Sequence, residues 1–451
     1  MFAGCGTRNE NSSDVTAAGM EGTSSSDTTA SAAPKENVTL QFWGGVPAES
    51  GPQEVCDNFN KEFASQGIKI EYTRFVNDAQ GNLKLDTSLM AGSDIDVYMT
   101  YFKEYLVKRA TANMALDLSE LVTKDNYDLV DKFGEVVKET TYIDGKPYGI
   151  PTKVENACFL LNKDMFDAAG IPIPESWTFE EFRDTAKKLT KGEGQNKVYG
   201  CFVDSNFRNN TPYQFANTKL GGDGVYKSGG KETNFDAPEF GKALQVLVDM
   251  MFVDQSMPTQ ADAITEKLDS SSMFLNGKAA MVLASWIVRD VKDLNKYPHT
   301  FVTAFAPAPV FSKSDEYYSS GGPGDNICIN PKSKHIDEVW TFIKWYAEKG
   351  MTPMAKYGRI PLYKDFSKEV IASTFLQGSE KLFDSESFTR VFITPVEKYQ
   401  VSTIITAAPE ILKITQEEYD AALYQKKSVD DAMASLKTRA DAALKAALDQ
   451  K

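Results

Sequence analysis

The sequence predicts an α/β fold in which a parallel, doubly wound sheet is flanked by helices. Short apolar strands alternate with helical patterns from Val38 onward, an arrangement typical of parallel sheets. The 451 residues are 42% hydrophobic and 25% charged, which is the composition of a soluble globular chain with room for more than one domain. The sequence contains no run of about 18 apolar residues, so it predicts no membrane-spanning helix.

The first elements form a βαβαβ pattern. Val38, Leu40 and Phe42 alternate with polar residues, which predicts a half-buried strand that ends at two glycines. Because ligands bind beyond the carboxyl ends of parallel strands, the residues that follow each strand are candidates for a site. The next elements are a helix at 55–63, a strand at 68–72, a helix at 83–90 and a strand at 96–101.

Later segments carry turn and capping signals. Asp144-Gly145 between two short apolar pairs predicts a hairpin. A strand at 159–161 follows, and then a helix whose end is marked by Gly170. Side-chain caps predict the starts of two further helices, at Thr178 (with Glu181 three residues on) and at Ser428.

Charge and composition exclude several classes of protein. Acidic residues outnumber basic ones by 63 to 49, giving a net charge of −14, whereas a nucleic-acid-binding protein needs a basic surface. The two histidines, His299 and His335, lie far apart, which argues against a zinc hydrolase. The five cysteines show no CxxC spacing, and four of them lie among apolar or small residues and are expected to be buried thiols. We expect no cofactor and no metal.

The N-terminal segment differs from the rest of the chain. Residues 6–37 contain mostly small and polar residues, which predicts a flexible tether. Just before them, Phe2-Ala3-Gly4-Cys5 resembles the end of a bacterial lipoprotein signal, in which small residues precede a lipidated cysteine. We therefore interpret residues 1–37 as a lipoprotein signal remnant and tether, with Cys5 as the lipidation site. The alternative is a cysteine in a disordered tail.

Several motifs together resemble the extracellular solute-binding proteins (family 1) of ABC importers, the carbohydrate-binding relatives of maltose-binding protein. The resemblance covers nearly everything from Val38 to the C-terminus, and the order and spacing of the motifs carry it. They are Leu40-Gln41-Phe42-Trp43-Gly44-Gly45, Tyr148-Gly149-Ile150-Pro151, Leu161-Asn162-Lys163-Asp164-Met165-Phe166, Ser176-Trp177-Thr178-Phe179-Glu180-Glu181-Phe182, Phe274-Leu275-Asn276-Gly277-Lys278-Ala279-Ala280-Met281 with Trp286, Gly321-Gly322 with Val339-Trp340, and Gly358-Arg359-Ile360-Pro361.

The resemblance implies a two-lobed periplasmic-binding-protein-like fold of type II, with each lobe a doubly wound sheet flanked by helices and a hinge between them. It implies lobe 1 at 38–148 with 321–350, and lobe 2 at 149–320 with 352–451. It also implies a monomeric, non-catalytic receptor on the extracellular face of the bacterial cytoplasmic membrane, held there only by a lipid anchor. Its expected partners are a small-molecule carbohydrate and the permease subunits of an ABC transporter, and not nucleic acid.

Aromatic residues are the first candidates for the binding site, because sugar ring faces pack on aromatic planes. Trp43 ends the first strand in the opposite phase to its apolar residues, so it is a candidate for lobe 1 and otherwise a core residue. Trp286 follows an apolar strand and resembles the cleft tryptophan of the family. Tyr101 ends the third strand, where it either contacts the ligand or closes the end of the sheet. Trp177, Trp340 and Trp345 lie in helical contexts that predict structural roles.

Polar candidates are the residues near the predicted crossings between lobes, because sugar hydroxyls need convergent donors and acceptors. Glu49 either faces the ligand or favours a helix N-terminus, and Arg359 either clamps the ligand or ties the hinge. Asn206 and Tyr213 are weaker candidates in a loop of lobe 2. The remaining candidates are Lys153, Glu155 and Asn156 after the first crossing, and Gly322 and Asp325 at the return crossing.

Three other functions stay open at this point. A glycoside hydrolase needs two carboxylates about 5 or 6.5–9.5 Å apart beside the scissile bond, and 63 acidic residues make chance pairs easy to find. A sensory module that reads the same ligand for a signalling partner has the same sequence features. Tyr317-Tyr318 resembles the paired tyrosines of iron-binding relatives, although two ordinary loop tyrosines are by far the better explanation.

Overall fold

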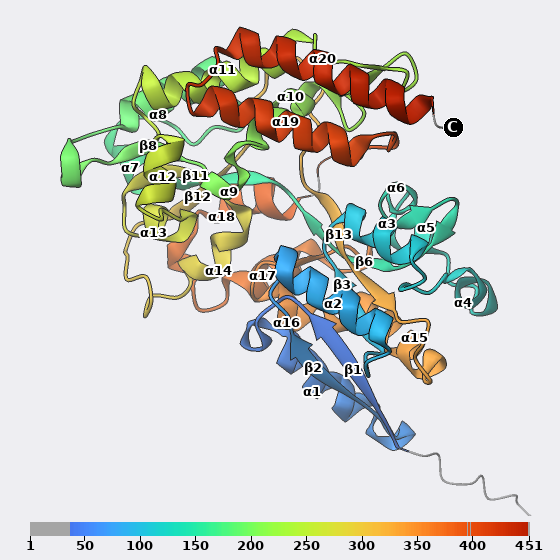
Figure 1. Cartoon of the computed structure of the whole chain (residues 1–451). Helices are drawn as coiled ribbons and strands as arrows, with labels where there is room; N and C mark the ends of the chain where they lie inside the picture. The colour runs from blue at the N-terminus through green and yellow to red at the C-terminus, as the bar shows by residue number, and fades with distance from the viewer. Residues whose placement is uncertain (1–36, 395, 397, 450–451) are drawn as a thin grey trace, which may run out of the picture. The chain divides into compact units, whose positions relative to one another are not determined.

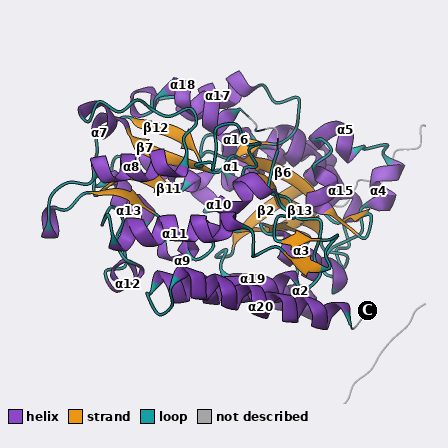
Figure 2. Cartoon of the chain, turned by 90° about the horizontal axis from the view of Figure 1, so that it is seen from above, coloured by secondary structure: helices purple, strands orange, loops and turns teal. Residues whose placement is uncertain are grey.

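The computed structural model describes residues 37–394, 396 and 398–449. The predictions for Cys5 and for the tether up to Glu36 lie outside the described residues. Within the described part, strands form two larger sheets with helices packed around each (Figure 1). Seen from above, the strands of the two sheets form separate groups (Figure 2).

The first sheet has six strands in the order β14-β6-β13-β3-β1-β2. β1 pairs in parallel with β2 and β3, which confirms the predicted βαβαβ unit with α1 and α2 as its helices. β13, β6 and β14 are antiparallel to their neighbours, so the sheet is mixed. The bounds are β1 Val38–Gly44, α1 Pro52–Glu62, β2 Ile68–Arg74, α2 Ala79–Ala91, β3 Val97–Thr100, β6 Ile150–Glu155, β13 Gly322–Ile329 and β14 Ile360–Pro361.

Both faces of this sheet are covered. Leu40 and Phe42 pack with Ile70 in one core, against α1 and the helix that follows β13. A second core lies on α2 and includes Leu85 and Tyr98. The alternation of side chains along a strand explains the two cores. The other helices of this part are α3 Lys103–Thr111, α4 Ser119–Lys124, α5 Leu129–Phe133, α6 Val137–Thr141, α15 Ile336–Trp345 and α16 Thr352–Ala355.

The predicted hairpin at Asp144-Gly145 is confirmed. Strands β4 (Tyr142–Ile143) and β5 (Lys146–Pro147) pair in an antiparallel manner on either side of it. Asp144 has φ 50° and Gly145 has φ 78°, and a two-residue turn with positive φ at both positions matches the twist of the paired strands.

The second sheet has four strands in the order β12-β7-β11-β8. β7 is antiparallel to both of its neighbours, and β11 pairs in parallel with β8. All five residues of β7 are buried, because separate apolar cores cover the two faces of the sheet. The bounds are β7 Cys158–Asn162, β8 Tyr199–Phe202, β11 Ala279–Leu283 and β12 Thr303–Pro307.

Two of the helices around the second sheet begin at the predicted side-chain caps. Thr178 and Glu181 form the predicted capping box, and Ser428 caps the last helix by accepting from Asp431 N. Helices α19 and α20 pack side by side, with α11 next to them (Figure 1). These helices are α7 Lys163–Ala168, α8 Phe179–Leu189, α9 Ser205–Arg208, α10 Thr211–Leu220, α11 Pro238–Phe252, α12 Gln260–Thr265, α13 Ser270–Leu275, α14 Val288–Val291, α17 Lys368–Leu376, α18 Ser385–Ser387, α19 Ala408–Leu423 and α20 Val429–Leu448.

The chain passes directly from the first sheet to the second at the end of β6. Only Asn156 and Ala157 separate β6 from β7. β6 and β14 both pair in the first sheet, beyond the lobe boundary predicted after residue 148. The lobe ranges as a whole stay a prediction.

The predicted structural residues are buried. The indole nitrogen of Trp177 donates to the carbonyl of Pro307 at 2.8 Å. Trp340 and Trp345 donate to carboxylates at 2.8 Å in each case. The four cysteines of the described part are free and buried, as predicted.

Candidate ligand-binding site

Four charged side chains gather where the strands of the first sheet approach the second. Arg359 comes just before β14 and forms an ion pair with Asp325 of β13. The ammonium of Lys153, on β6, lies 2.7 Å from Glu155 and 3.9 Å from Asp325. Arg359 and Lys153 are mostly buried, with 20% and 16% of their side chains exposed. Buried charges of this kind are retained only with partners in place, so the cluster is preorganised.

The Glu155 carboxylate joins this cluster to the second sheet. Its Oε1 accepts a 2.5 Å hydrogen bond from the hydroxyl of Ser285, which begins the short 3-10 turn Ser285–Ile287 (η4) after β11. The charge of Lys153 lowers the pKa of Glu155 to about 2, against the opposing effect of burial. Burial lowers the pKa of Lys153, while Glu155 opposes that change. At neutral pH the carboxylate is therefore ionised and already paired.

Tyr101 closes one side of the cluster. Its hydroxyl accepts a 2.5 Å hydrogen bond from Gly45 N, and the guanidinium carbon of Arg359 lies 6.0 Å from its ring centroid. A Cβ on Gly45 would lie 2.9 Å from the Tyr101 ring. Glycine at this position therefore lets the loop after β1 approach the end of β3.

The second sheet contributes two exposed aromatic side chains. Trp286 of η4 is 42% exposed, and Phe207 of α9 is 51% exposed. Their ring centroids lie 5.3 Å apart in an edge-to-face arrangement, which is favourable for aromatic pairs. Adjacent exposed apolar side chains of this kind are typical of ligand-binding or interaction surfaces. Trp286 was predicted from the sequence, whereas Phe207 was not, although the adjacent Asn206 was a candidate.

Five of the twelve predicted site residues line one small cavity beside this aromatic pair. The cavity has a volume of about 40 Å³. Ser285 and Arg289 also line it. Neither was predicted from the sequence, because Trp286 was the only residue of this segment selected as a candidate. The five predicted residues are Lys153, Glu155, Asn156, Trp286 and Arg359.

Two of the predicted residues, Asn156 and Gly322, make contacts within the protein that explain why these residue types stand there. Asn156 donates to the carbonyls of Phe392 and Thr394 at 3.2 and 2.7 Å, and its oxygen accepts from Tyr399 at 3.2 Å. Gly322 has φ 126°, and a Cβ there would meet the Tyr399 ring at 3.3 Å. Both residues shape the crossing between the sheets.

The four remaining predicted residues, like Tyr101, Gly322 and Asp325, do not line this cavity. Trp43 is half-buried against the core on α2, with the ammonium of Lys84 5.8 Å from its ring. Glu49 is exposed in a 3-10 turn before α1. Asn206 is exposed on α9, and Tyr213 packs on α10, where burial raises the pKa of its hydroxyl. Their roles in binding stay predictions.

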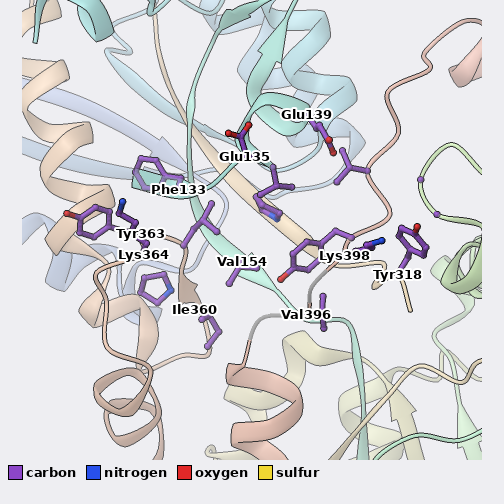
Figure 3. A pocket seen from close by; sticks show the side chains of 18 of the residues that line it. Phe133, Glu135, Glu139, Val154, Tyr318, Ile360, Tyr363, Lys364, Val396 and Lys398 are labelled. Atoms are coloured by element: carbon purple, nitrogen blue, oxygen red, sulfur yellow. The ribbon is translucent and has the colours of Figure 1, made fainter. Parts of the chain in front are cut away.

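A second, larger cavity of about 890 Å³ lies on the other side of β6. Val154 and Ile360 line both cavities, whereas Lys153 and Glu155, the residues on either side of Val154, line only the small one. Figure 3 shows the side chains around Val154, which include Glu139 of the first part and Lys398 and Tyr318 of the second. None of the twelve predicted site residues lines this cavity.

The two adjacent tyrosines considered for iron lie in different surroundings. Tyr317 packs against the core of the second sheet, and burial raises its pKa to about 12. The hydroxyl of Tyr318 instead donates to Glu316 at 2.6 Å. Among the described residues, no three His, Cys, Asp or Glu side chains are grouped so as to hold a metal ion.

Two sheets flanked by helices are joined by short chain segments, with paired charges and exposed aromatic rings where the chain crosses. This arrangement defines a two-lobed binding protein. The chain belongs to the bacterial extracellular solute-binding protein family, whose family model matches residues 46–353. The members of this family and the structural neighbours are binding proteins rather than enzymes.

Individual relatives have low identity but long coverage. The arabinooligosaccharide-binding protein of Bacillus subtilis is 24% identical over 301 residues, which is 64% of each chain. A sugar transporter from Rhizobium etli in an open conformation has a TM-score of 0.70 at 22% identity, covering 91% of this chain and 99% of that one. An ABC substrate-binding protein from Listeria monocytogenes in complex with cycloalternan also has a TM-score of 0.70, at 20% identity, covering 90% of this chain and 98% of that one. These structures confirm the two-lobed fold.

A helix that crosses a bilayer must be both long and apolar. Among the residues that the structure describes, no helix meets both conditions.

Proposed function

We propose that this protein is an extracellular receptor that captures a sugar or oligosaccharide between its two lobes and delivers it to an ABC import permease. The observation that carries the proposal is the exposed pair of Trp286 and Phe207 beside a preorganised charged cluster. Aromatic planes bind the C–H faces of sugar rings, and charged or amide groups bind the hydroxyls. The sugar ligands named for the Bacillus and Listeria proteins agree with this class of ligand.

The charged cluster is suited to binding rather than to hydrolysis. A glycoside hydrolase needs a carboxylic acid with a raised pKa to protonate the leaving group. The pKa of Glu155 is instead lowered to about 2, and Asp325 is in an ion pair with Arg359. Glu155 therefore holds no proton at neutral pH and Asp325 is bound to Arg359, so this pair favours a receptor that does not alter its ligand.

Capture is proposed to occur by closure of the lobes. A ligand that contacts Trp286 on one lobe and the cluster around Tyr101 on the other makes its full set of contacts only in the closed form. It therefore favours that form by its differential affinity. Changing a mostly open population into a mostly closed one takes about 5 kcal/mol of such preference. A micromolar affinity of about −8 kcal/mol leaves room for it and still allows release.

The lipid anchor belongs to the same proposal. A lipidated Cys5 and the tether that follows it would keep a monomeric receptor at the outer face of the cytoplasmic membrane. Holding the receptor near the permease raises its effective concentration there.

A thermal-shift screen of mono- and oligosaccharides tests the proposal. A ligand that binds only the native state raises the melting temperature by mass action. We expect at least one saccharide to raise it, and peptides, polyamines and ferric iron to leave it unchanged. If every saccharide fails while one of those others succeeds, the proposed ligand class is wrong.

A further inference from the structure

The residues around Trp286 carry more positive charge than a neutral sugar requires. Arg289 lies three residues after Trp286, so the two side chains lie on the same side of the turn. Arg289 lines the same small cavity as Arg359 and Lys153. Three cations therefore surround this space.

Each of these cations has a carboxylate as ion-pair partner, but of the three carboxylates only Glu155 lines the cavity. Lys153 pairs with Glu155, and Arg359 pairs with Asp325. Arg289 has a 3.6 Å ion pair with its own neighbour, Asp290. Asp290 also accepts a 2.5 Å hydrogen bond from the hydroxyl of Ser271 and does not line the cavity. Within the residues that the structure describes, no hydrogen bond to a carboxylate is formed by Arg289, which is 34% exposed.

The size of the cavity indicates which part of a ligand enters it. Its volume of about 40 Å³ exceeds the roughly 10–15 Å³ of cavity space that holds one water molecule. The cavity therefore has room for a few waters, or for a substituent the size of a carboxylate. The ring itself would lie on the exposed faces of Trp286 and Phe207 at the rim.

We propose that the ligand is an acidic saccharide, a uronic acid or an oligosaccharide of uronic acids, whose carboxylate binds between Arg289 and Arg359 while its ring packs on Trp286. The inference rests on the proposed function, because it assumes that a sugar binds at this site. Planar guanidinium groups bind carboxylates in a bidentate manner. The chain has a net charge of −14 and repels anions at long range, so local cations are needed to bind one.

Size alone does not distinguish a carboxylate from the hydroxymethyl group of a neutral hexose, so the test must vary charge. Calorimetric titration compares digalacturonate with two matched ligands, its dimethyl ester and the corresponding neutral galactose disaccharide. A diglucuronate series and the monosaccharides are run in parallel. We expect an acid to bind at least tenfold more tightly than both of its neutral counterparts, and its affinity to fall as salt is raised from 50 to 500 mM, because salt screens partly exposed charges.

The Arg289→Gln variant locates the effect. We expect it to remove most of the preference for the acid, because it should weaken binding of the acid much more than binding of the neutral ligands. Lys381→Gln is the matched control, since it removes one charge from an exposed lysine of the second part of the chain. It should keep the preference.

The possible failures are distinguishable. If neutral saccharides bind and no uronic acid binds more tightly than its neutral counterpart, the inference is wrong and the proposed function stands. If no saccharide of either kind binds, the proposed function itself is wrong. If Arg289→Gln keeps the full preference for the acid, the assignment of the carboxylate to Arg289 is overturned.

Discussion

The hydroxyl of Ser285 donates a 2.5 Å hydrogen bond to Oε1 of Glu155, and this bond joins the turn after β11 to the end of β6. Glu155 ends a strand of the first sheet, whereas Ser285 lies in the turn after a strand of the second sheet, 130 residues further along the chain. Glu155 also binds Lys153, so one carboxylate links the charged cluster of the first sheet to the turn that carries Trp286. A ligand at this crossing would contact both parts of the protein at once.

Acid should weaken the protein partly through Glu155. Its pKa in the folded state is about 2, below the ordinary value of 4.5, so its contribution to stability is present above about pH 4.5 and is lost as pH falls toward 2. The free energy of unfolding of the wild type should fall more between pH 5 and pH 3 than that of Glu155→Gln. We expect a difference of about 1 kcal/mol, because the carboxylate is 35% exposed and solvent screens it. Urea titrations at the two pH values measure it.

Glu104→Gln provides the control for this titration. Glu104 is exposed on α3, and its removal should leave the pH dependence of unfolding as in the wild type. Equal pH dependence in the wild type and Glu155→Gln would mean that the carboxylate is not held in its charged form by Lys153.

The end of β3, which positions Tyr101, depends on a buried ion pair. The side chains of Arg109 and Asp86 are 0% and 1% exposed and lie 2.8 Å apart, and Arg109 also donates to Thr100 at the end of β3. Arg109→Met should lower the free energy of unfolding by about 3 kcal/mol, because it removes the buried hydrogen bonds of Arg109 to Asp86, Thr100 and Asn82 and leaves Asp86 with Lys108 as its ion-pair partner. Lys124→Met, which breaks a pair with 66% and 76% of its side chains exposed, should cost less than about 1 kcal/mol. Similar losses in urea titrations of the two variants would contradict this account.

The sequence predicted those parts of the fold that depend on local patterns. The alternation at Val38, Leu40 and Phe42 correctly predicted β1, and the turn residues Asp144-Gly145 correctly predicted a hairpin. The direction of the later strands was not predictable in this way. β6 and β13 belong to the first sheet because of pairings between residues far apart in the chain, and such pairings leave no periodic signal in either strand.

The candidate site, too, was predictable where local motifs mark its residues and not where contacts between distant segments form it. Trp286 was predicted because it follows an apolar strand and resembles a tryptophan of the family, and Glu155 because it follows the predicted first crossing. The structure brings both to one cavity. Phe207 was missed because its role depends on packing against Trp286 across the fold. Asn156 was selected for its position, but its amide is already bonded to the backbone of residues 392 and 394.

The exposed aromatic pair should dominate the affinity for a saccharide. Trp286→Ala and Phe207→Ala each remove a stacking surface that is 42% and 51% exposed, respectively, so we expect at least a tenfold loss of affinity for Trp286→Ala and a smaller loss for Phe207→Ala. Because both side chains are exposed, the melting temperature of the free protein should change little. Calorimetric titration with the saccharide from the thermal-shift screen measures both effects.

Tyr318→Ala is the matched control, because Tyr318 lines the larger cavity on the other side of β6 and not the small one. It should bind the saccharide like the wild type. A large loss with Tyr318→Ala and none with Trp286→Ala would instead assign the ligand to the larger cavity.

Closure of the lobes should appear in solution as a change in size. If a saccharide contacts Trp286 on one lobe and the cluster around Tyr101 on the other, bound protein is more compact than free protein. Small-angle scattering should therefore show a smaller radius of gyration at saturating saccharide than without it. A saccharide that gives no thermal shift should leave the curve unchanged. With Trp286→Ala, the decrease should require at least tenfold more saccharide, since the same end state is reached with weaker binding. A radius of gyration that stays constant while calorimetry shows the wild type to be saturated would contradict closure, because a ligand held by both lobes cannot bind fully without bringing them together.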